Sequence, residues 1–319
     1  MLDALTFSSA DSALLELGQH LRAIGYSFIT PTPATHARVN GRPENAWAGG
    51  VRDVFGWSRP FRSGVLPEGI FGAMQQANIV EPFQDGWRST LRLSSLGGDV
   101  FWHSAFPTSA PDAVFFGPDT YRFVHAALAE AGPVGRAVDV CSGAGPGAIA
   151  LARLRPAAEV LMADINDNAL RLSSVNARLA GVADRVTAHR SNLLGGVEGA
   201  FDLVIANPPY LLDPAERTYR HGGGSLGAGL SLAIIDAALD RLVPGGTLVL
   251  YTGVAIVDGH DAFHTDAAAC LDACGANWAY REIDPDVFGE ELTDGVYATA
   301  DRIAAVLLTA TKRKVTDNA

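Results

Sequence analysis

The spacing of apolar side chains changes near residue 112, and the change divides the chain into two parts. In the first part, four leucines and an isoleucine recur at helical spacing between residues 11 and 24, which predicts a helix with Asp11 or Ser12 as its N-cap. A second helix is expected from Leu66 to Ala77, with Pro67 near its first turn.

Other segments of the first part read as loops and strands. The stretch from Thr30 to Arg62 is rich in proline, glycine and arginine, and we expect it to be irregular with one short helix. Two strand-like runs, 89–96 and 99–104, flank Gly97-Gly98 and predict a β-hairpin. Helices followed by a hairpin are typical of small winged-helix domains. We therefore predict an α+β domain over residues 1–108 that serves as an accessory or substrate-recognition domain.

Beyond residue 112, short apolar runs and helical segments follow one another in turn. The predicted strands are 136–140, 159–163, 186–189, 202–206, 246–251, 278–283 and 303–308, and the predicted helices are 121–131, 147–154, 168–180, 230–242 and 262–273. Strands separated by helices at this pitch predict an α/β fold with a doubly wound, mostly parallel, seven-stranded sheet of the Rossmann-like kind. The predicted domain covers residues 109–312, and 313–319 form a tail.

Composition narrows the class of protein. The net charge of -11 opposes phosphate backbones, and the densest basic run, Lys312-Arg313-Lys314, is expected to be a solvated tail, so a nucleic-acid partner is disfavoured. Three cysteines without nearby histidines predict neither a disulfide framework nor a metal site. No apolar run reaches about 18 residues and no leader is evident, so we expect a cytoplasmic protein without a membrane partner.

One glycine-rich turn, from Asp139 to Gly147, directly follows a predicted strand and opens a helix. Glycines at 143, 145 and 147 permit positive φ and allow a ligand to approach the backbone closely. The N-terminus of the following helix attracts anionic groups. The glycine spacing and Pro146 depart from the G-x-G-x-x-G pattern, so a dinucleotide-dependent dehydrogenase is disfavoured.

Acidic and amide side chains follow the next two strands. Asp164 ends the second strand, where a carboxylate can accept hydrogen bonds from both hydroxyls of a ribose; a helix N-cap is its alternative role. Asn192 follows the third strand, and its amide oxygen could accept a hydrogen bond from an adenine amine, more weakly than a carboxylate would. A plain loop residue is the alternative at that position.

The fourth strand ends in Asn207-Pro208-Pro209-Tyr210, where consecutive prolines stiffen the backbone. A rigid turn without chemical function is the alternative. The glycine turn, Asp164 and this motif, in this order, resemble class I S-adenosylmethionine-dependent methyltransferases of planar nitrogens, most closely the HemK-type glutamine methyltransferases. Gly117-Pro118-Asp119-Thr120 resembles an element that precedes the first strand in that family. The resemblance covers about residues 112–310, and Cys141 departs from it by replacing the first glycine of the family's turn.

The resemblance implies S-adenosylmethionine as the cofactor and S-adenosylhomocysteine as the product. The Asn207 side-chain oxygen and the Pro208 carbonyl would hold the two N–H groups of the acceptor nitrogen, and Tyr210 would stack on the flat acceptor group. The residues expected to bind the cofactor are Asp139, Cys141, Gly143, Gly145, Gly147, Asp164, Ile165, Asn192, Leu193, Asn207 and Thr120.

The sequence does not identify the methyl acceptor. We predict transfer of a methyl group to an amide or guanidinium nitrogen of a small molecule or a protein side chain. A nucleic-acid amino-group methyltransferase and a non-catalytic binding protein with this fold are the alternatives, and the sequence does not decide between a monomer and a homodimer.

Three further segments of the sequence could contact the acceptor. Five glycines within residues 222–229 predict either a lid or a flexible connector, next to His221 as a conceivable proton acceptor. The acidic stretch Asp286, Glu290, Glu291 and Asp294 is either a solvated loop or a site for a cationic acceptor. Aromatic residues of the first domain could line the path of the acceptor; they are Trp47, Trp57, Trp102 and His103.

Overall fold

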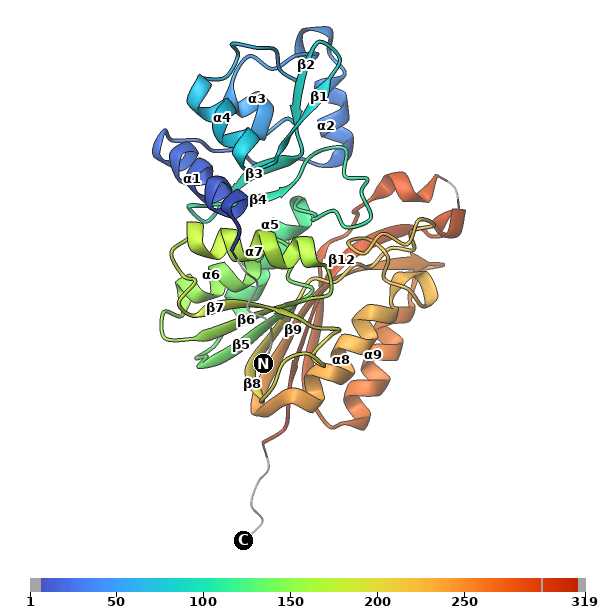
Figure 1. Cartoon of the computed structure of the whole chain (residues 1–319). Coiled ribbons are helices and arrows are strands. Elements are labelled where there is room, and N and C mark those ends of the chain that lie inside the picture. The colour runs from blue at the N-terminus through green and yellow to red at the C-terminus, as the bar shows by residue number, and fades with distance from the viewer. Residues whose placement is uncertain (1–6, 294, 315–319) are drawn as a thin grey trace.

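The computed structural model describes residues 7–293 and 295–314, in which a large sheet carries helices on both faces and an N-terminal region stacks on one helical layer (Figure 1). The strand order is β11-β12-β9-β8-β5-β6-β7, with a short β10 paired to β9. Strands β5 to β8 and the neighbouring part of β9 are parallel, whereas β12 is antiparallel to β9 and β11. The bounds are β5 Arg136–Val140, β6 Glu159–Asp164, β7 Val186–Arg190, β8 Phe201–Ala206, β9 Leu242–Val257, β10 His260–Asp261, β11 Asn277–Asp284 and β12 Arg302–Thr311.

This sheet confirms the predicted doubly wound, mostly parallel fold. One difference concerns β9, which runs well past the predicted 246–251 because β12 pairs with it from Thr247 to Ile256. Helices α5 (Pro118–Glu130), α6 (Pro146–Leu154) and α7 (Asp167–Leu179) cover one face, and α8 (Gly229–Arg241) and α9 (Ala262–Ala273) cover the other (Figure 1).

Strand β8 shows why these strands read as continuous apolar runs. Leu203 and Ile205 join the core beneath α5 to α7, while Val204 and Ala206 join the core beneath α8 and α9. Successive side chains of a strand point to opposite faces, so a strand covered on both sides must be apolar at every position.

From residue 7 to residue 104, the N-terminal region contains four α-helices and two β-hairpins. The helices are α1 (Ser9–Ala23), α2 (Pro33–Asn40), α3 (Val51–Phe55) and α4 (Glu68–Gln76), with a 3₁₀ turn at Pro43–Asn45; the hairpins are β1 (Val80–Phe83) with β2 (Gly86–Ser89), and β3 (Leu91–Leu96) with β4 (Asp99–Ser104). The hairpin predicted around Gly97-Gly98 is confirmed. A winged-helix likeness stays a prediction.

Two details of the N-terminal prediction are wrong. The N-cap of α1 is Ser8, neither Asp11 nor Ser12, because the Ser8 hydroxyl accepts from the Asp11 N–H while the Asp11 carboxylate accepts from the Ser8 N–H. The segment from Thr30 to Arg62 holds two helices and a 3₁₀ turn, where one short helix was expected. Pro33 is favourable in the first turn of α2, so its presence does not oppose a helix there.

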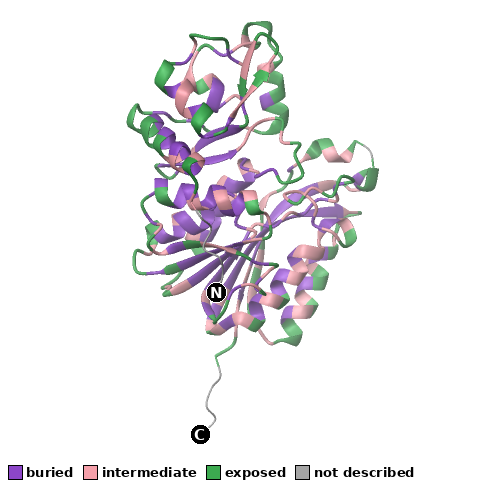
Figure 2. Cartoon of the chain, viewed as in Figure 1, coloured by how far each residue is buried: buried purple, intermediate pink, exposed green. Residues whose placement is uncertain are grey.

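The N-terminal region shares one hydrophobic core with the helices that cover the sheet, and Figure 2 shows buried residues on both sides of this contact. Asn176 of α7 is fully buried here: its Oδ1 accepts from the Trp102 N–H (2.8 Å), and its Nδ2 donates to the carbonyls of Trp102 (3.1 Å) and Ala144 (2.9 Å). One side chain therefore ties β4 to the glycine turn. The division of the chain at residue 108 stays a prediction.

Across residues 7–293 and 295–314, no helix combines the length and the apolar character needed to cross a bilayer.

Candidate functional site

A cavity lies at the carboxyl ends of β5, β6 and β8, where parallel sheets commonly bind ligands. One of its walls consists of the glycine turn 141–147, Asp164 and the corner 207–210; we call it the sheet wall. The opposite wall comes from the connecting segments 105–117 and 211–221, which we call the loop wall. Ten predicted site residues line the cavity: Thr120, Cys141, Gly143, Asp164, Ile165, Asn192, Leu193, Asn207, Pro208 and Tyr210.

Three other predicted residues, Asp139, Gly145 and Gly147, lie behind the sheet wall. Asp139 is 1% exposed, and its Oδ2 accepts from the Ala148 N–H at 2.9 Å. A Cβ on Gly147 would lie 2.7 Å from that same oxygen, so only glycine fits there. Burial raises the pKa of Asp139 to about 8, which keeps this carboxyl largely protonated at neutral pH. These residues set the path of the turn without forming the cavity surface.

The turn itself uses left-handed backbone at Cys141 (φ 58°), Gly143 (φ 54°) and Gly145 (φ 81°). The Gly143 N–H donates to Asp164 Oδ2 at 2.9 Å, and the Asn166 N–H donates to Oδ1 at 2.9 Å. Asp164 thus locks the turn to the end of β6, and burial raises its pKa. The alternative role of Asp164 as a helix N-cap is wrong, because Asn166 caps α7.

An apolar slot lies next to this carboxylate. Ile165 is 49% exposed although it is a large hydrophobic residue, and it lines the cavity with Leu193 and Asn192. A Cβ on Gly143 would meet nothing within 4 Å, so the backbone of the turn faces open space here. This slot has the surface that a flat, partly apolar group such as a purine requires.

The corner after β8 presents polar atoms without partners. Within the part of the chain that the structure describes, the Asn207 carboxamide makes no hydrogen bond, and no backbone N–H donates to the Pro208 carbonyl. Tyr210 is firmly packed: it is 7% exposed, and a Cβ on Gly253 of β9 would lie 2.2 Å from its ring. Stacking of Tyr210 on an acceptor stays a prediction.

A buried carboxyl beside the corner was not singled out from the sequence. Asp119, at the start of α5, lines the cavity, is 4% exposed, and accepts hydrogen bonds from the Tyr251 hydroxyl (2.7 Å) and from Arg122 (3.2 Å). The Tyr210 hydroxyl is buried beside it without a hydrogen bond of ordinary geometry. Burial raises the pKa of Asp119 and of both tyrosines. The position of Asp119 next to Thr120 in the Gly-Pro-Asp-Thr element was the available signal.

Four of the five glycines in 222–229 are closely packed, and Gly223 is the exception. A Cβ on Gly227 would lie 2.1 Å from the Tyr210 carbonyl oxygen, and a Cβ on Gly222 would lie 2.7 Å from that of Pro209. The Gly222 N–H also donates to the Leu211 carbonyl at 2.8 Å. Gly222 and Gly227 thus pack against the Pro-Pro-Tyr backbone, and the choice between a lid and a connector stays a prediction.

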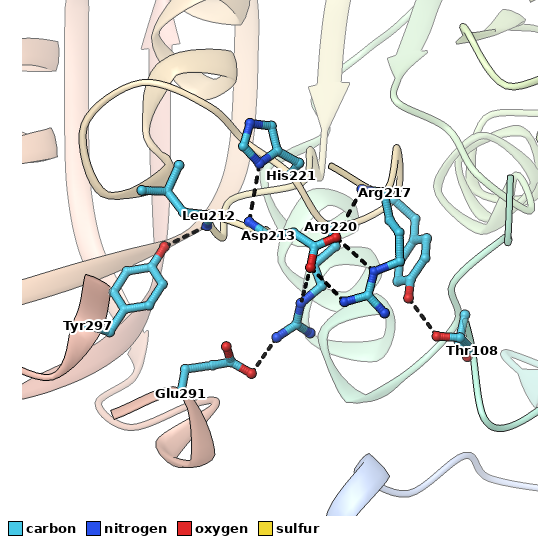
Figure 3. A network of polar contacts seen from close by, with 9 residues as sticks. Thr108, Leu212, Asp213, Arg217, Arg220, His221, Glu291 and Tyr297 are labelled. Atoms are coloured by element: carbon cyan, nitrogen blue, oxygen red, sulfur yellow. Dashed lines mark hydrogen bonds and ion pairs between the residues drawn. The ribbon is translucent and has the colours of Figure 1, made fainter. Parts of the chain in front are cut away.

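The loop wall is held by side chains from distant parts of the chain (Figure 3). Asp213, 3% exposed, accepts from the Arg217 side chain at 2.6 and 2.7 Å, and these bonds lower its pKa to about 2. Arg220, which lines the cavity, pairs with Glu291, and the Tyr219 hydroxyl donates to the Thr108 carbonyl at 2.7 Å.

Two further bonds complete this network. The Tyr297 hydroxyl accepts from the Leu212 N–H at 2.8 Å (Figure 3). His221 Nδ1 accepts from the Asp213 N–H at 3.2 Å, so His221 supports the loop instead of facing the cavity. Tyr219 also stacks on Phe115, with ring centroids 6.4 Å apart and an interplanar angle of 6°. The two segments of the loop wall therefore close on each other.

The aromatic residues of the N-terminal region lie elsewhere. Trp102 and His103 are fully buried in the core, and neither Trp47 nor Trp57 lines the cavity. The expectation that they line the cavity is wrong, and the aromatic residues Phe115 and Tyr219 line it instead. Glu291, from the acidic stretch, is engaged by Arg220, and Asp294 lies outside the described residues.

Comparison with known proteins agrees with this geometry. Residues 121–255 match the family model described as "Methyltransferase small domain". The chain is 33% identical over 211 residues to the release factor glutamine methyltransferase of Deinococcus radiodurans, covering 62% of this chain and 72% of that protein. It is 34% identical over 146 residues to the ribosomal protein uL3 glutamine methyltransferase of Bordetella pertussis, covering 42% of this chain and 47% of that protein.

Among solved structures, the fold is similar to that of Methanocaldococcus jannaschii Trm5 in complex with adenosine. The TM-score is 0.52 at 18% identity, over 81% of this chain and 63% of that one, which supports the fold alone. The family model, by contrast, spans residues 121–255, which include the glycine turn and the Asn-Pro-Pro-Tyr corner. The chain belongs to the HemK-like class I methyltransferases, which depend on S-adenosylmethionine.

Proposed function

We propose that this enzyme methylates the side-chain amide nitrogen of a glutamine in a protein acceptor. One observation carries the proposal: the unpartnered Asn207 carboxamide and Pro208 carbonyl line the same cavity as the glycine turn and Asp164. A methyl donor on the turn and an amide at the corner would therefore meet inside one cavity. The names of the relatives, both glutamine methyltransferases, support the choice of acceptor.

The residues of the sheet wall fit S-adenosylmethionine. Each Asp164 oxygen accepts one backbone hydrogen bond and retains a lone pair for a ribose hydroxyl. The exposed Ile165 side chain and Leu193 offer apolar surface to the adenine ring, with the Asn192 carboxamide beside them for its amine. When bound, this cofactor supplies a methyl group on a cationic sulfonium, and S-adenosylhomocysteine is the product.

The corner residues would compensate for the low nucleophilicity of the acceptor nitrogen. The lone pair of an amide nitrogen is delocalised into its carbonyl, so the nitrogen is a poor nucleophile. The Asn207 side-chain oxygen and the Pro208 carbonyl would accept the two N–H groups and fix the direction of the nitrogen. Because consecutive prolines and Gly227 hold this backbone in place, orientation costs little entropy at the moment of reaction.

The loop wall suits a protein acceptor. Phe115 and Tyr219 present aromatic surface to the cavity, and Arg220 beside them is held by Glu291. A cytoplasmic location is part of the same proposal, because a translation-related protein acceptor would be found there. The net charge of -11 makes a nucleic-acid acceptor the weaker alternative.

Labelled S-adenosylmethionine tests the proposal. The enzyme is incubated with a cell lysate separated into protein, RNA and small-molecule fractions, and the labelled fraction is treated with protease or ribonuclease. We expect protease-sensitive label, which fragmentation mass spectrometry places on a glutamine. Label in RNA or in small molecules alone would contradict the glutamine assignment.

A further inference from the structure

A second, smaller cavity contains a buried positive charge without a counter-ion. Its lining includes Arg92 of β3, His36 of α2, Thr30 and Phe115. Arg92 is 4% exposed, and the one hydrogen-bond partner of its guanidinium among residues 7–293 and 295–314 is His36 Nδ1, at 3.2 Å from Nη1. Its Nε has no partner within the same residues. No carboxylate of those residues pairs with it.

Two neighbouring ionisable side chains, His36 and Arg59, do not neutralise this charge. Burial and Arg92 itself lower the pKa of His36 to about 4, so His36 is neutral and accepts from Arg92 while its Nε2 donates to the Trp57 carbonyl at 2.7 Å. Arg59, the next nearby cation, is already paired with Asp53 at 2.8 Å. Buried charges in proteins are almost always paired, because an isolated one is costly.

The shape of the cavity restricts the missing partner. Its volume is about 20 Å³, so only a compact group can occupy it. Proline and phenylalanine side chains make up most of the remaining lining; they are Pro31, Pro33, Phe106, Phe116 and Pro118. A compact anion with a short apolar substituent suits this lining. A guanidinium pairs with a planar carboxylate through two parallel hydrogen bonds.

We propose that Arg92 and the cavity around it form a carboxylate-binding site. Phe115 lines both this cavity and the large one, so the site lies directly behind the loop wall. The carboxylate could belong to a free small organic acid or to the methyl acceptor; the second source rests on the proposed function, and the first does not.

Acetate serves as the probe. We expect the melting temperature of the full chain to rise in sodium acetate over sodium chloride of equal ionic strength, by about 2 °C or more at an acetate concentration tenfold above its Kd. Arg92→Met should abolish this rise and, in chloride, be at least as stable as the wild type, because it removes an unpaired buried charge. Arg88→Met, at an exposed arginine paired with Glu81, should retain the full rise. A wild type without an acetate-specific rise, or an Arg92→Met variant that keeps it, overturns the site.

A crystal of the wild-type protein soaked in acetate covers the case in which Arg92→Met fails to fold. Planar density hydrogen-bonded to the Arg92 guanidinium supports the site, and its absence at saturating acetate overturns it.

Methyl-transfer kinetics with the protein fraction distinguish the two sources. If the acceptor supplies the carboxylate, acetate competes with it, and Arg92→Met raises KM about tenfold with kcat within twofold. If a free organic acid supplies the carboxylate, Arg92→Met leaves KM and kcat unchanged, while acetate still raises the melting temperature of the wild type. Should no methyl transfer occur at all, the proposed function fails, and the melting and crystal results still decide the site.

Discussion

The two walls of the large cavity are built in different ways. The sheet wall depends on backbone conformation: left-handed residues in the turn 141–147, two prolines at the corner 207–210, and glycines packed against them. The loop wall depends on side-chain bonds between segments far apart in the chain, such as Tyr219 with Thr108 and Arg220 with Glu291. The residues of the sheet wall are therefore fixed by local backbone geometry, whereas the loop wall is held by contacts between distant segments of the chain.

The largest effect is expected for Gly227→Ala, which places a Cβ against the backbone of the sheet wall. Gly223 and Gly227 both have positive φ (66° and 86°), but the nearest atom to a Cβ on Gly223 is 3.9 Å away, against 2.1 Å on Gly227. Gly223→Ala, the matched control, should lower the free energy of unfolding by about 1 kcal/mol through strain alone, and Gly227→Ala by about 4 kcal/mol through strain and overlap. Urea unfolding measures both; equal losses would contradict the close packing.

The second-largest effect is expected from lowering the pH, which should reduce the folding stability that His36 provides beside the loop wall. The His36 ring lies 4.2 Å from that of Phe106, at the start of the loop wall, and its pKa is lowered from 6.5 to about 4, chiefly by burial. The neutral form is therefore favoured by folding: its contribution is complete above pH 6.5 and is lost as the pH falls toward 4, up to roughly 3 kcal/mol.

Urea unfolding of the wild type and of His36→Gln at several pH values between 7 and 4 tests this. The wild type should lose more stability than the variant across that interval. Parallel pH dependences would show that His36 is not the responsible group.

Asn207→Ala removes the chemistry of the sheet wall and leaves its backbone intact. We expect turnover to fall about 100-fold, because the acceptor nitrogen loses its orienting oxygen, while the Kd for S-adenosylmethionine changes less than about threefold. Asn192→Ala is the matched control and should weaken cofactor binding more than turnover. Steady-state kinetics and calorimetry measure the two quantities, and equal loss of both in Asn207→Ala would argue against an acceptor role.

The smallest effect concerns a single bond of the loop wall. Tyr219→Phe keeps the stacking on Phe115 and loses the hydrogen bond to the Thr108 carbonyl, which is worth about 1 kcal/mol. Limited proteolysis within residues 211–221 should therefore accelerate about fivefold. Tyr280→Phe removes a similar bond, to Asp261 at a distance from the cavity, and should leave that rate unchanged. An unchanged rate in Tyr219→Phe would mean that the bond does not hold the loop wall.

The contrast between the walls also explains what the sequence could predict. The sheet and its turn follow from short-range rules, so strand 136–140 and helix 262–273 were placed at their observed bounds. Asn207 and Asp164 were found because Asp164 ends one strand of the parallel sheet and Asn207 directly follows another. Asn176, by contrast, joins the glycine turn to β4 across 74 residues, and no local pattern marks it.

The glycines of one segment did not indicate how closely it packs. The five glycines of 222–229 predicted mobility, whereas Gly222 and Gly227 are required by close packing against the corner. A sequence shows that a side chain is missing, but only the structure shows whether a neighbouring backbone occupies the space. The same reason applies to Arg92, since its isolation in the core depends on which side chains surround it.

Titration calorimetry of the purified protein with S-adenosylmethionine and with S-adenosylhomocysteine tests most directly that the sheet wall is a methyl-donor site. We predict saturable binding of both compounds at one site per chain, weakened at least tenfold in Asp164→Ala, which removes the ribose acceptor. Absence of binding to the wild-type protein, or equal affinity in Asp164→Ala, would contradict the account.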